Sequence, residues 1–233
     1  MRYLFFMVLL LCFSCGKDKV ILLPEIENAK ITEVLDVSPA YLFYNETLTD
    51  SIELNRKNII STTNWLVNVD KRLTLKQAIP KIKFLQDKKR NAQMHKNENA
   101  KNYFTCNATS IKNLGFIEFT DVVYEFIESS LDFKQILTSY KKIDSVNELE
   151  DSLNIFSINF HEDHTIYMHK NSFKIEDLTT KIKELAKNPE YKKIQLKLTM
   201  SKSLTFQDYI TFKSLVLELE SDSISIDNNE FIY

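Results

Sequence analysis

Glycine is nearly absent from this sequence. Only two glycines, Gly16 and Gly115, occur among its 233 residues. Loops that cradle phosphate groups use glycine to bring backbone amides close to the anion. The chain also contains no GxGxxG, no GKS/T and no G-x-S-x-G pattern. The sequence therefore argues against nucleotide-binding loops of these kinds and against the nucleophile elbow of α/β-hydrolases.

The sequence also has few cysteines and a net charge close to zero. Once a leader is removed, Cys106 would be the only unmodified cysteine, so no intramolecular disulfide between side chains can form. We expect Cys106, within "YFTCNAT", to be a buried strand thiol, because no activating base is indicated. The 30 basic and 32 acidic residues nearly balance, so no global field favours nucleic acid. We expect neither a nucleic-acid partner nor a cofactor.

No apolar run is long enough to cross a membrane, which takes about 20 residues. The run over 3–13 follows a basic residue and precedes Ser14 and Cys15, as in a secretory signal peptide. Cys15 resembles the lipidated cysteine of a bacterial lipobox, although Cys12–Phe13 departs from the usual leucine-then-small pattern. We predict a signal peptide over 1–14 and lipidation of Cys15. Ordinary secretory cleavage near the same place is the alternative.

Both alternatives place the mature chain outside the cytoplasm. We expect it in the bacterial cell envelope, facing the periplasm or the cell surface. The lipid anchor would hold it to a membrane, the outer rather than the inner one. Residues 15–35 are expected to form a lipid-anchored tether, because the stretch over 16–30 is short, charged and proline-containing.

Hydrophobic periodicity in the first half predicts strands, an amphipathic helix, a further strand and a second helix. Thr74 and Gln77 at the start of the first helix have the form of a capping box. The second helix is expected over "FTDVVYEFIES", which begins at Phe119. The strands are expected at 41–45, 51–55, 64–70 and in "YFTCNAT", and the apolar face of the first helix comprises Leu75, Ala78, Ile79, Ile82 and Leu85.

The second half shows the same kinds of element. A strand at 154–160 and a second at 165–170 flank the polar turn "HEDH" and predict a hairpin. A helix over 173–187, a strand over 194–200 and a helix over 206–220 follow, and "SISI" and "EFIY" close the chain in extended form.

A similar order of elements in both halves predicts an internal repeat. "LTLKQAIPKIKFL" at 73–85 has the pattern of "FKIEDLTTKIKEL" at 173–185, and Phe119-x-Asp121 matches Phe206-x-Asp208. Differences in spacing fall in loops, as expected of a duplication. The predicted fold class is α/β (α+β), with two tandem β-β-α-β-α-β units.

The expected domain organisation follows from this repeat. The first unit is expected over 36–135, a polar linker over 136–150 and the second unit over 151–233. The short linker gives each unit a high effective concentration around the other. We therefore expect the two units to pack together as an internal pseudo-dimer that covers strand edges.

The second unit resembles the extracytoplasmic domain of the ExbD/TolR family. The resemblance is carried by a hairpin that enters a helix with Ile175 and Leu178, a hydrophobic strand, and a second helix that opens with the aromatic Phe206. It covers residues 152–232 well and 50–130 weakly, through hydrophobic patterns rather than invariant motifs. It implies an α/β scaffold of the kind that pairs with itself, with envelope proteins or with peptidoglycan.

The resemblance does not extend to the part of the family that carries protons. Members have an uncleaved transmembrane helix with a functional aspartate, whereas the only apolar segment here has no acidic residue and is expected to be cleaved. We therefore expect a non-enzymatic envelope lipoprotein that binds an envelope protein or peptidoglycan, without proton-channel activity of its own.

One cluster could support an enzyme instead. "HEDHTIYMH" contains His161, His164 and His169, and imidazole and carboxylate groups on a hairpin could reach a Zn²⁺ or Cu²⁺ ion. The alternative function is therefore a metal-binding or hydrolytic periplasmic enzyme. A polar hairpin tip without metal explains the same residues, and the spacing fits no established ligand motif.

Overall fold

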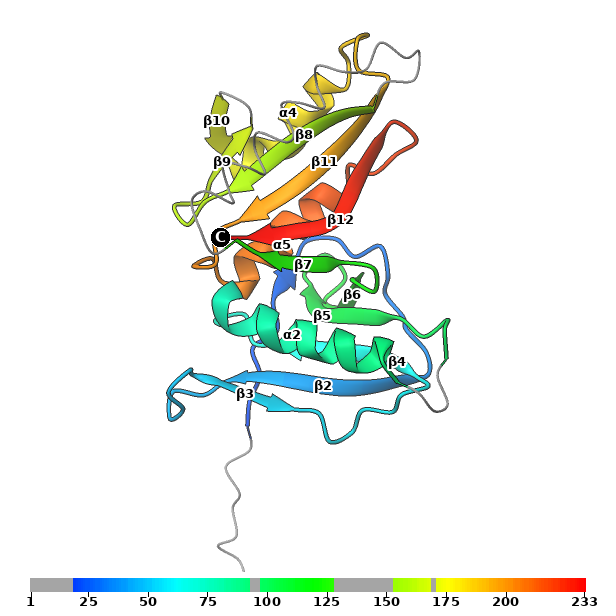
Figure 1. Cartoon of the computed structure of the whole chain (residues 1–233), viewed down its shortest axis with the longest axis vertical. Coiled ribbons are helices and arrows are strands. Elements are labelled where there is room, and N and C mark those ends of the chain that lie inside the picture. The colour runs from blue at the N-terminus through cyan, green and yellow to red at the C-terminus, as the bar shows by residue number, and fades with distance from the viewer. Residues whose placement is uncertain (1–18, 93–96, 128–152, 169–170) are drawn as a thin grey trace, which may run out of the picture.

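The computed structural model describes residues 19–92, 97–127, 153–168 and 171–233. These residues form a mixed α/β fold with two six-stranded mixed sheets, which confirms the predicted fold class at this level. Figure 1 shows the sheet that carries α2 below and the sheet that carries α4 above, with β7 and β12 side by side where they meet. Within the described part of the chain, no helix is long and apolar enough to span a bilayer.

The first sheet has the strand order β1-β5-β4-β2-β3, and β6 pairs with β5. β2, β4 and β5 run parallel, and β3 returns antiparallel to β2. The buried residues of α2 include the whole predicted apolar face, and Gln77 accepts a hydrogen bond from the Thr74 amide as a capping box requires. The elements are β1 (Glu25–Ile26), β2 (Val37–Tyr44), β3 (Ile52–Asn55), β4 (Asn64–Val69), α2 (Leu75–Arg90), β5 (Asn102–Ala108) and β6 (Asn113–Glu118).

The second sheet has the order β10-β9-β8-β11-β12-β7. The predicted hairpin, the strand after it and the last helix all occur close to their expected positions. The expected helix over 173–187 starts later, because residues 171–174 pair with β9 as a further strand. The elements are β7 (Val123–Phe126), β8 (Leu153–Phe160), β9 (Thr165–Met168), β10 (Asn171–Lys174), the 3₁₀ turn η2 (Ile175–Asp177), α4 (Leu178–Leu185), β11 (Lys193–Met200), α5 (Phe206–Leu217) and β12 (Ile224–Ile232).

The two sheets share a four-strand topology. The order β5-β4-β2-β3 in the first corresponds to β12-β11-β8-β9 in the second, with the same parallel and antiparallel pairings. α2 connects β4 to β5 as α5 connects β11 to β12. α4 lies between the second hairpin and β11, whereas residues 56–63 between β3 and β4 form no helix.

This topology corrects the sequence alignment of the repeat. The helix at 73–85 corresponds to α5, because both helices follow the third strand, in chain order, of their four-strand set. It does not correspond to the helix at 173–185, which lies before that strand. The matching sequences are therefore "KRLTL" at 71–75 and "KSLTF" at 202–206. Amphipathic helices share a period whatever their place in a fold, so similarity of period misidentified the partner.

These two matching loops contact each other reciprocally. The Leu75 amide donates to the Leu204 carbonyl at 2.9 Å, and the Phe206 amide donates to the Leu73 carbonyl at 2.6 Å. Thr74 and Thr205, the N-caps of α2 and α5, form an antiparallel bridge. Each loop both donates a hydrogen bond to the other and accepts one from it, as the two sides of an isologous interface do.

The predicted second helix of the first half is wrong. Residues Val123–Phe126 form β7, which pairs parallel with β12 at the edge of the second sheet. Tyr124 is buried there, and its hydroxyl lies 3.0 Å from that of Tyr209 on α5. Strand pairing with a segment far along the chain therefore overrides the helical period of "FTDVVYEFIES".

A single cluster of buried side chains runs through both sheets. At its centre Phe104 of β5 stacks on Phe119 at a centroid distance of 3.8 Å and meets Phe206 of α5 edge-on at 5.2 Å. Aromatic side chains from the two halves thus pack on one another in geometries that aromatic rings prefer.

The scarcity of glycine shows in the backbone. Among the described residues, the positive-φ positions are Asp36, Ser51, Lys112 and His164, and none is glycine. Lys112 and His164 each lie between two antiparallel strands, where turns often need a left-handed residue.

Candidate functional site

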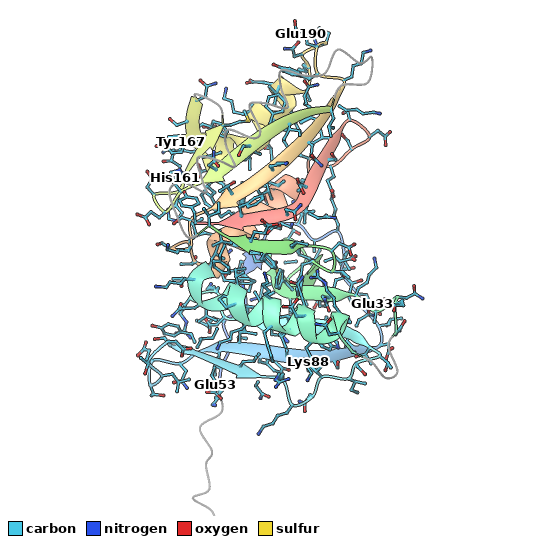
Figure 2. All side chains as sticks on the ribbon, in the orientation of Figure 1. Glu33, Glu53, Lys88, His161, Tyr167 and Glu190 are labelled. Atoms are coloured by element: carbon cyan, nitrogen blue, oxygen red, sulfur yellow. The ribbon has the colours of Figure 1, made fainter. Side chains whose placement is uncertain are left out.

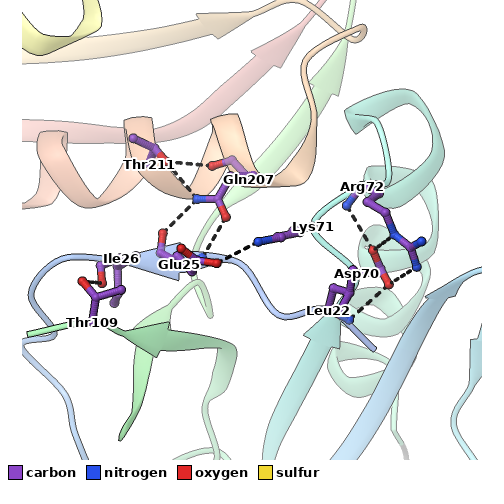
Figure 3. A network of polar contacts seen from close by, with 9 residues as sticks. All are labelled: Leu22, Glu25, Ile26, Asp70, Lys71, Arg72, Thr109, Gln207 and Thr211. Atoms are coloured by element: carbon purple, nitrogen blue, oxygen red, sulfur yellow. Dashed lines mark hydrogen bonds and ion pairs between the residues drawn. The ribbon is translucent and has the colours of Figure 1, made fainter. Parts of the chain in front are cut away.

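The N-terminal part of the described chain is docked on the domain. We call residues 19–31 the strap. The Lys71 amide donates to the Leu22 carbonyl at 2.7 Å, and β1 pairs parallel with β5. Figure 3 shows Glu25 between the two halves: it bonds Gln207 through its backbone amide and carbonyl, both at 2.8 Å, and its carboxylate accepts from Lys71 at 2.7 Å. Of the lipid-anchored tether expected over 15–35, residues 19–31 are therefore docked on the folded domain.

A buried carboxylate helps to hold the strap. Asp70 is fully buried and accepts two hydrogen bonds of 2.9 Å from the Arg72 guanidinium, one of 3.1 Å from the Arg72 amide and one of 3.2 Å from the Leu22 amide (Figure 3). Burial acts to raise the pKa of Asp70, but the hydrogen bonds from Arg72 and Leu22 outweigh it and hold that pKa below its usual value. The carboxylate therefore stays ionised while it accepts from the strap.

Gly115 of β6 makes close packing of the strap possible. A Cβ atom at this position would lie 2.5 Å from the Cβ of Ala29 and 3.2 Å from that of Ala108. The close approach explains why one of the two glycines in the sequence occurs here.

A cavity of about 500 Å³ lies between the strap, β6 and α5. Most of its surface is apolar, and charged groups from all three elements lie around it. The apolar walls are formed by Ile26, Ala29, Ile31, Phe116, Ile117 and Leu217. Cavities of this size with apolar walls and a few polar groups are the usual form of a binding site.

The charge around this cavity is predominantly negative. Glu118 of β6 and Glu218 and Glu220 at the end of α5 contribute carboxylates, of which Glu118 pairs with Lys101 at 2.9 Å. Lys30 of the strap donates to the Leu217 carbonyl, in the last turn of α5, at 2.6 Å. The site offers an apolar surface next to a helix C-terminus and carboxylates, which suits a ligand with an apolar body and a cationic group.

The histidine hairpin is present, but its described histidines contact different groups. Nε2 of His164 lies 3.2 Å from Oδ1 of Asp208, the capping carboxylate of α5. The ring of His161 packs against Tyr167 at a centroid distance of 4.6 Å (Figure 2). His169 lies outside the described residues. Within the described ranges no group of three or more His, Cys, Asp or Glu side chains could hold a metal ion, and the three-histidine site stays a prediction.

Two buried groups that could serve as nucleophiles are held in structural surroundings. Cys106 of β5 is fully buried as predicted, and burial raises the pKa of its thiol to about 12. Lys89 of α2 is also buried, and its ammonium donates to the carbonyls of Thr63 and Lys101 and to Oδ1 of Asn102 at 2.8 to 3.3 Å. Both side chains are better explained as parts of the core than as catalytic groups.

Neither the docked strap nor its cavity was predicted from the sequence. The signal was the apolar spacing of Ile21, Leu23, Ile26 and Ile31, which a solvated tether does not need. Cys15 lies outside the described residues. No protein-family model, curated protein or solved structure matches this chain significantly.

Proposed function

We propose that this chain is a non-enzymatic lipoprotein of the bacterial cell envelope that binds an envelope protein or peptidoglycan. The observation that carries the proposal is the apolar cavity of about 500 Å³ between strap, β6 and α5, because it is a formed binding surface. The hydroxyl in its lining, that of Ser214, donates to the Thr211 carbonyl at 2.9 Å within α5. The apolar run that ends at Ser14 and Cys15 supports export and lipidation.

The resemblance to the ExbD/TolR extracytoplasmic domain is part of this proposal for the second half. The order hairpin, helix, strand, helix, strand over β8 to β12 supports it, with β10 as an addition. In the first half, residues 56–63 take the place of the first helix, whereas α2 corresponds to the second helix, α5. Support there is limited to the shared order of four strands and to this one helix.

Docking of the strap affects how an anchored domain would behave. The chain between Cys15 and Lys19 can extend over at most about 14 Å. With a lipid on Cys15, the domain would therefore stay close to its membrane and meet partners there, rather than reach across the periplasm. The binding function we propose is accordingly that of a membrane-proximal module.

The anchor is tested by labelling cells that express the full chain with an alkyne-tagged fatty acid. We expect label on the wild type and on Cys12→Ala, which keeps the acceptor cysteine, and none on Cys15→Ala. Label that persists on Cys15→Ala would remove the lipoprotein part of the proposal.

The binding function is tested by cross-linking in intact envelopes followed by purification of the chain. We expect an envelope protein or peptidoglycan fragment to be enriched with the wild type. Ser214→Trp, which places a large side chain in the cavity from the half-buried face of α5, should lose that enrichment. Equal recovery of all envelope components with both chains would refute a binding role for this cavity.

A further inference from the structure

The walls of the strap cavity discriminate between the two kinds of partner. Phe116, Ile117 and Leu217 present hydrocarbon rather than hydrogen-bonding groups. Glycan strands and their short stem peptides carry few large apolar groups, so they would leave this surface poorly covered. A protein segment with a leucine-, isoleucine- or phenylalanine-sized side chain would cover it and gain free energy in proportion to the apolar area removed from water.

The charges next to these walls favour a cation. The α5 helix ends at Leu217, where the last carbonyls carry the negative end of the helix dipole, and Glu218 and Glu220 follow directly. Glu118 lies on the facing strand β6. Glu118 is already paired with Lys101, but an incoming carboxylate would still meet the like charges of Glu218 and Glu220, whereas a lysine or arginine would meet complementary ones.

Lys30 already shows how a cation binds here. Its ammonium, carried by the strap, donates to the Leu217 carbonyl at 2.6 Å beside the apolar walls. Lys30 is exposed, so its side chain can swing away without uncovering a buried charge. The same carbonyl can therefore accept from a second cation once Lys30 leaves.

We infer that the strap cavity receives a segment of a partner protein in which a large apolar residue is followed by lysine or arginine. The apolar side chain packs against Phe116 and Leu217, and the cation replaces Lys30 at the C-terminus of α5. This inference rests on the proposed binding function and selects protein over peptidoglycan. It also makes Lys30 a built-in competitor for the partner's cation.

The test uses the mature chain and three probes in saturation-transfer NMR titrations. The probes are an acetylated, amidated Leu-Leu-Lys-Lys peptide, its Leu-Leu-Glu-Glu counterpart, and a disaccharide tetrapeptide from peptidoglycan. We expect the basic peptide to bind most tightly. Lys30→Met should tighten binding of the basic peptide about fivefold, because the peptide no longer has to displace one hydrogen bond of about 1 kcal/mol. Glu218→Gln with Glu220→Gln should weaken it about as much.

Matched variants distinguish this effect from general charge effects and from misfolding. Lys187→Met and Glu190→Gln change exposed charges at the far end of the second half and should leave the affinity for the basic peptide unchanged. Thermal melts of every variant should match the wild type, because the altered cavity residues are exposed. Equal binding of the acidic peptide, or no change in Lys30→Met, would overturn the inference. Tighter binding of the peptidoglycan fragment would overturn it too, while leaving the proposed binding function intact; only a failed enrichment from envelopes would remove that.

Discussion

α2 and α5 follow equivalent strands in the two halves, yet they bury different chemistry. Ile82 follows the capping Thr74 at the same spacing as Lys213 follows Thr205, and both are buried. On the neighbouring strands, Phe104 is paired with Val67 in the first half where Glu230 is paired with Leu198 in the second. Apolar Ile82 and Phe104 in the first half therefore occupy the positions of the buried ion pair Lys213–Glu230 in the second.

The ion pair ties the second half to a strand from the first. Lys213 donates to Glu230, which also accepts from the Tyr209 hydroxyl at 2.9 Å. Tyr209 in turn contacts Tyr124 of β7, and burial raises the pKa of both tyrosines well above the usual value. A buried ion pair adds little net stability, but it penalises arrangements that leave one of its charges unpaired. This polar cluster therefore favours β7 as the partner of β12.

The largest effect is expected when the second half is separated from the first. A fragment over 150–233 lacks β7 and the strap, so the edge of β12 and the face of α5 that meets Phe104 lose their cover. We expect it to self-associate or to lose most of its free energy of unfolding. Analytical ultracentrifugation and thermal melts against residues 19–233 would measure this. A monomeric fragment as stable as the longer chain would mean that the halves are independent, and the pseudo-dimer would be dropped.

Loss of one ion-pair partner should have the next largest effect. Lys213→Met leaves the fully buried Glu230 carboxylate without its cation and should cost about 3–5 kcal/mol in the free energy of unfolding. Lys213→Met with Glu230→Gln keeps an acceptor for Tyr209 and should recover most of that loss. Urea denaturation gives both values. If the double variant were as unstable as the single one, packing rather than charge would explain the site.

The two sheets also differ in how β12 and its counterpart β5 are covered. β12 pairs with β7, whereas β5 pairs with β6 and with β1 of the strap, and the strap packs closely against Gly115 of β6. Gly115→Ala should cost about 1–3 kcal/mol, because the new methyl group overlaps Ala29. Adding Ala29→Gly should restore part of the stability. Urea denaturation would reveal the effect, and an unchanged midpoint for Gly115→Ala would show that the strap moves away freely.

The sequence predicted most elements where local pattern and tertiary role agree. The apolar face of α2, the hairpin of β8 and β9 and the buried thiol of Cys106 all follow from periodicity and composition. β7 was missed because Tyr124 and its neighbours satisfy a helical period, while their pairing with β12 depends on residues more than a hundred positions away.

The candidate site could not have been predicted in the same way. Its walls come from the strap, β6 and α5, which are distant in sequence and meet only in the folded chain. The shared four-strand topology aligns "KRLTL" with "KSLTF", and not the longer helical patterns on which the predicted repeat was based. A capping threonine carries more positional information than an amphipathic period, because it marks where a helix begins.

The N-caps of α2 and α5 are equivalent positions that should contribute unequally to the free energy of unfolding. The Asp208 amide donates to the Thr205 hydroxyl at 3.2 Å, and the Asp208 carboxylate accepts from the Thr205 amide at 2.8 Å. The Thr205 hydroxyl also donates to that carboxylate at 2.6 Å, whereas the Thr74 hydroxyl donates to the neutral Gln77 side chain at 2.9 Å. Thr205→Ala should therefore cost about 1 kcal/mol, and Thr74→Ala less. Urea denaturation of the two variants side by side would decide this, and a larger loss at Thr74 would contradict it.

A pH-dependent difference concerns the last turn of α2, which extends beyond the length of α5. Lys89 is buried there, whereas Glu220, the residue at the same spacing in the second half, is exposed past the end of α5. Burial lowers the pKa of Lys89 to about 8. Between about pH 8 and the unfolded value of about 10.4, the unfolded chain then binds more protons than the folded one. The stability contributed by Lys89 should therefore rise with pH across that window.

Urea denaturation at pH 7 to 10 of the wild type, Lys89→Met and the exposed neighbour Lys88→Met would isolate this contribution. We expect the wild type to gain stability relative to Lys89→Met as the pH rises, and to stay parallel to Lys88→Met, because Lys88 is solvated in both states (Figure 2). Three oxygen acceptors around the Lys89 ammonium oppose the effect of burial, since they favour the charged form. Parallel curves for wild type and Lys89→Met would mean that these acceptors fully offset burial, so that α2 ends on a charged lysine at every pH tested.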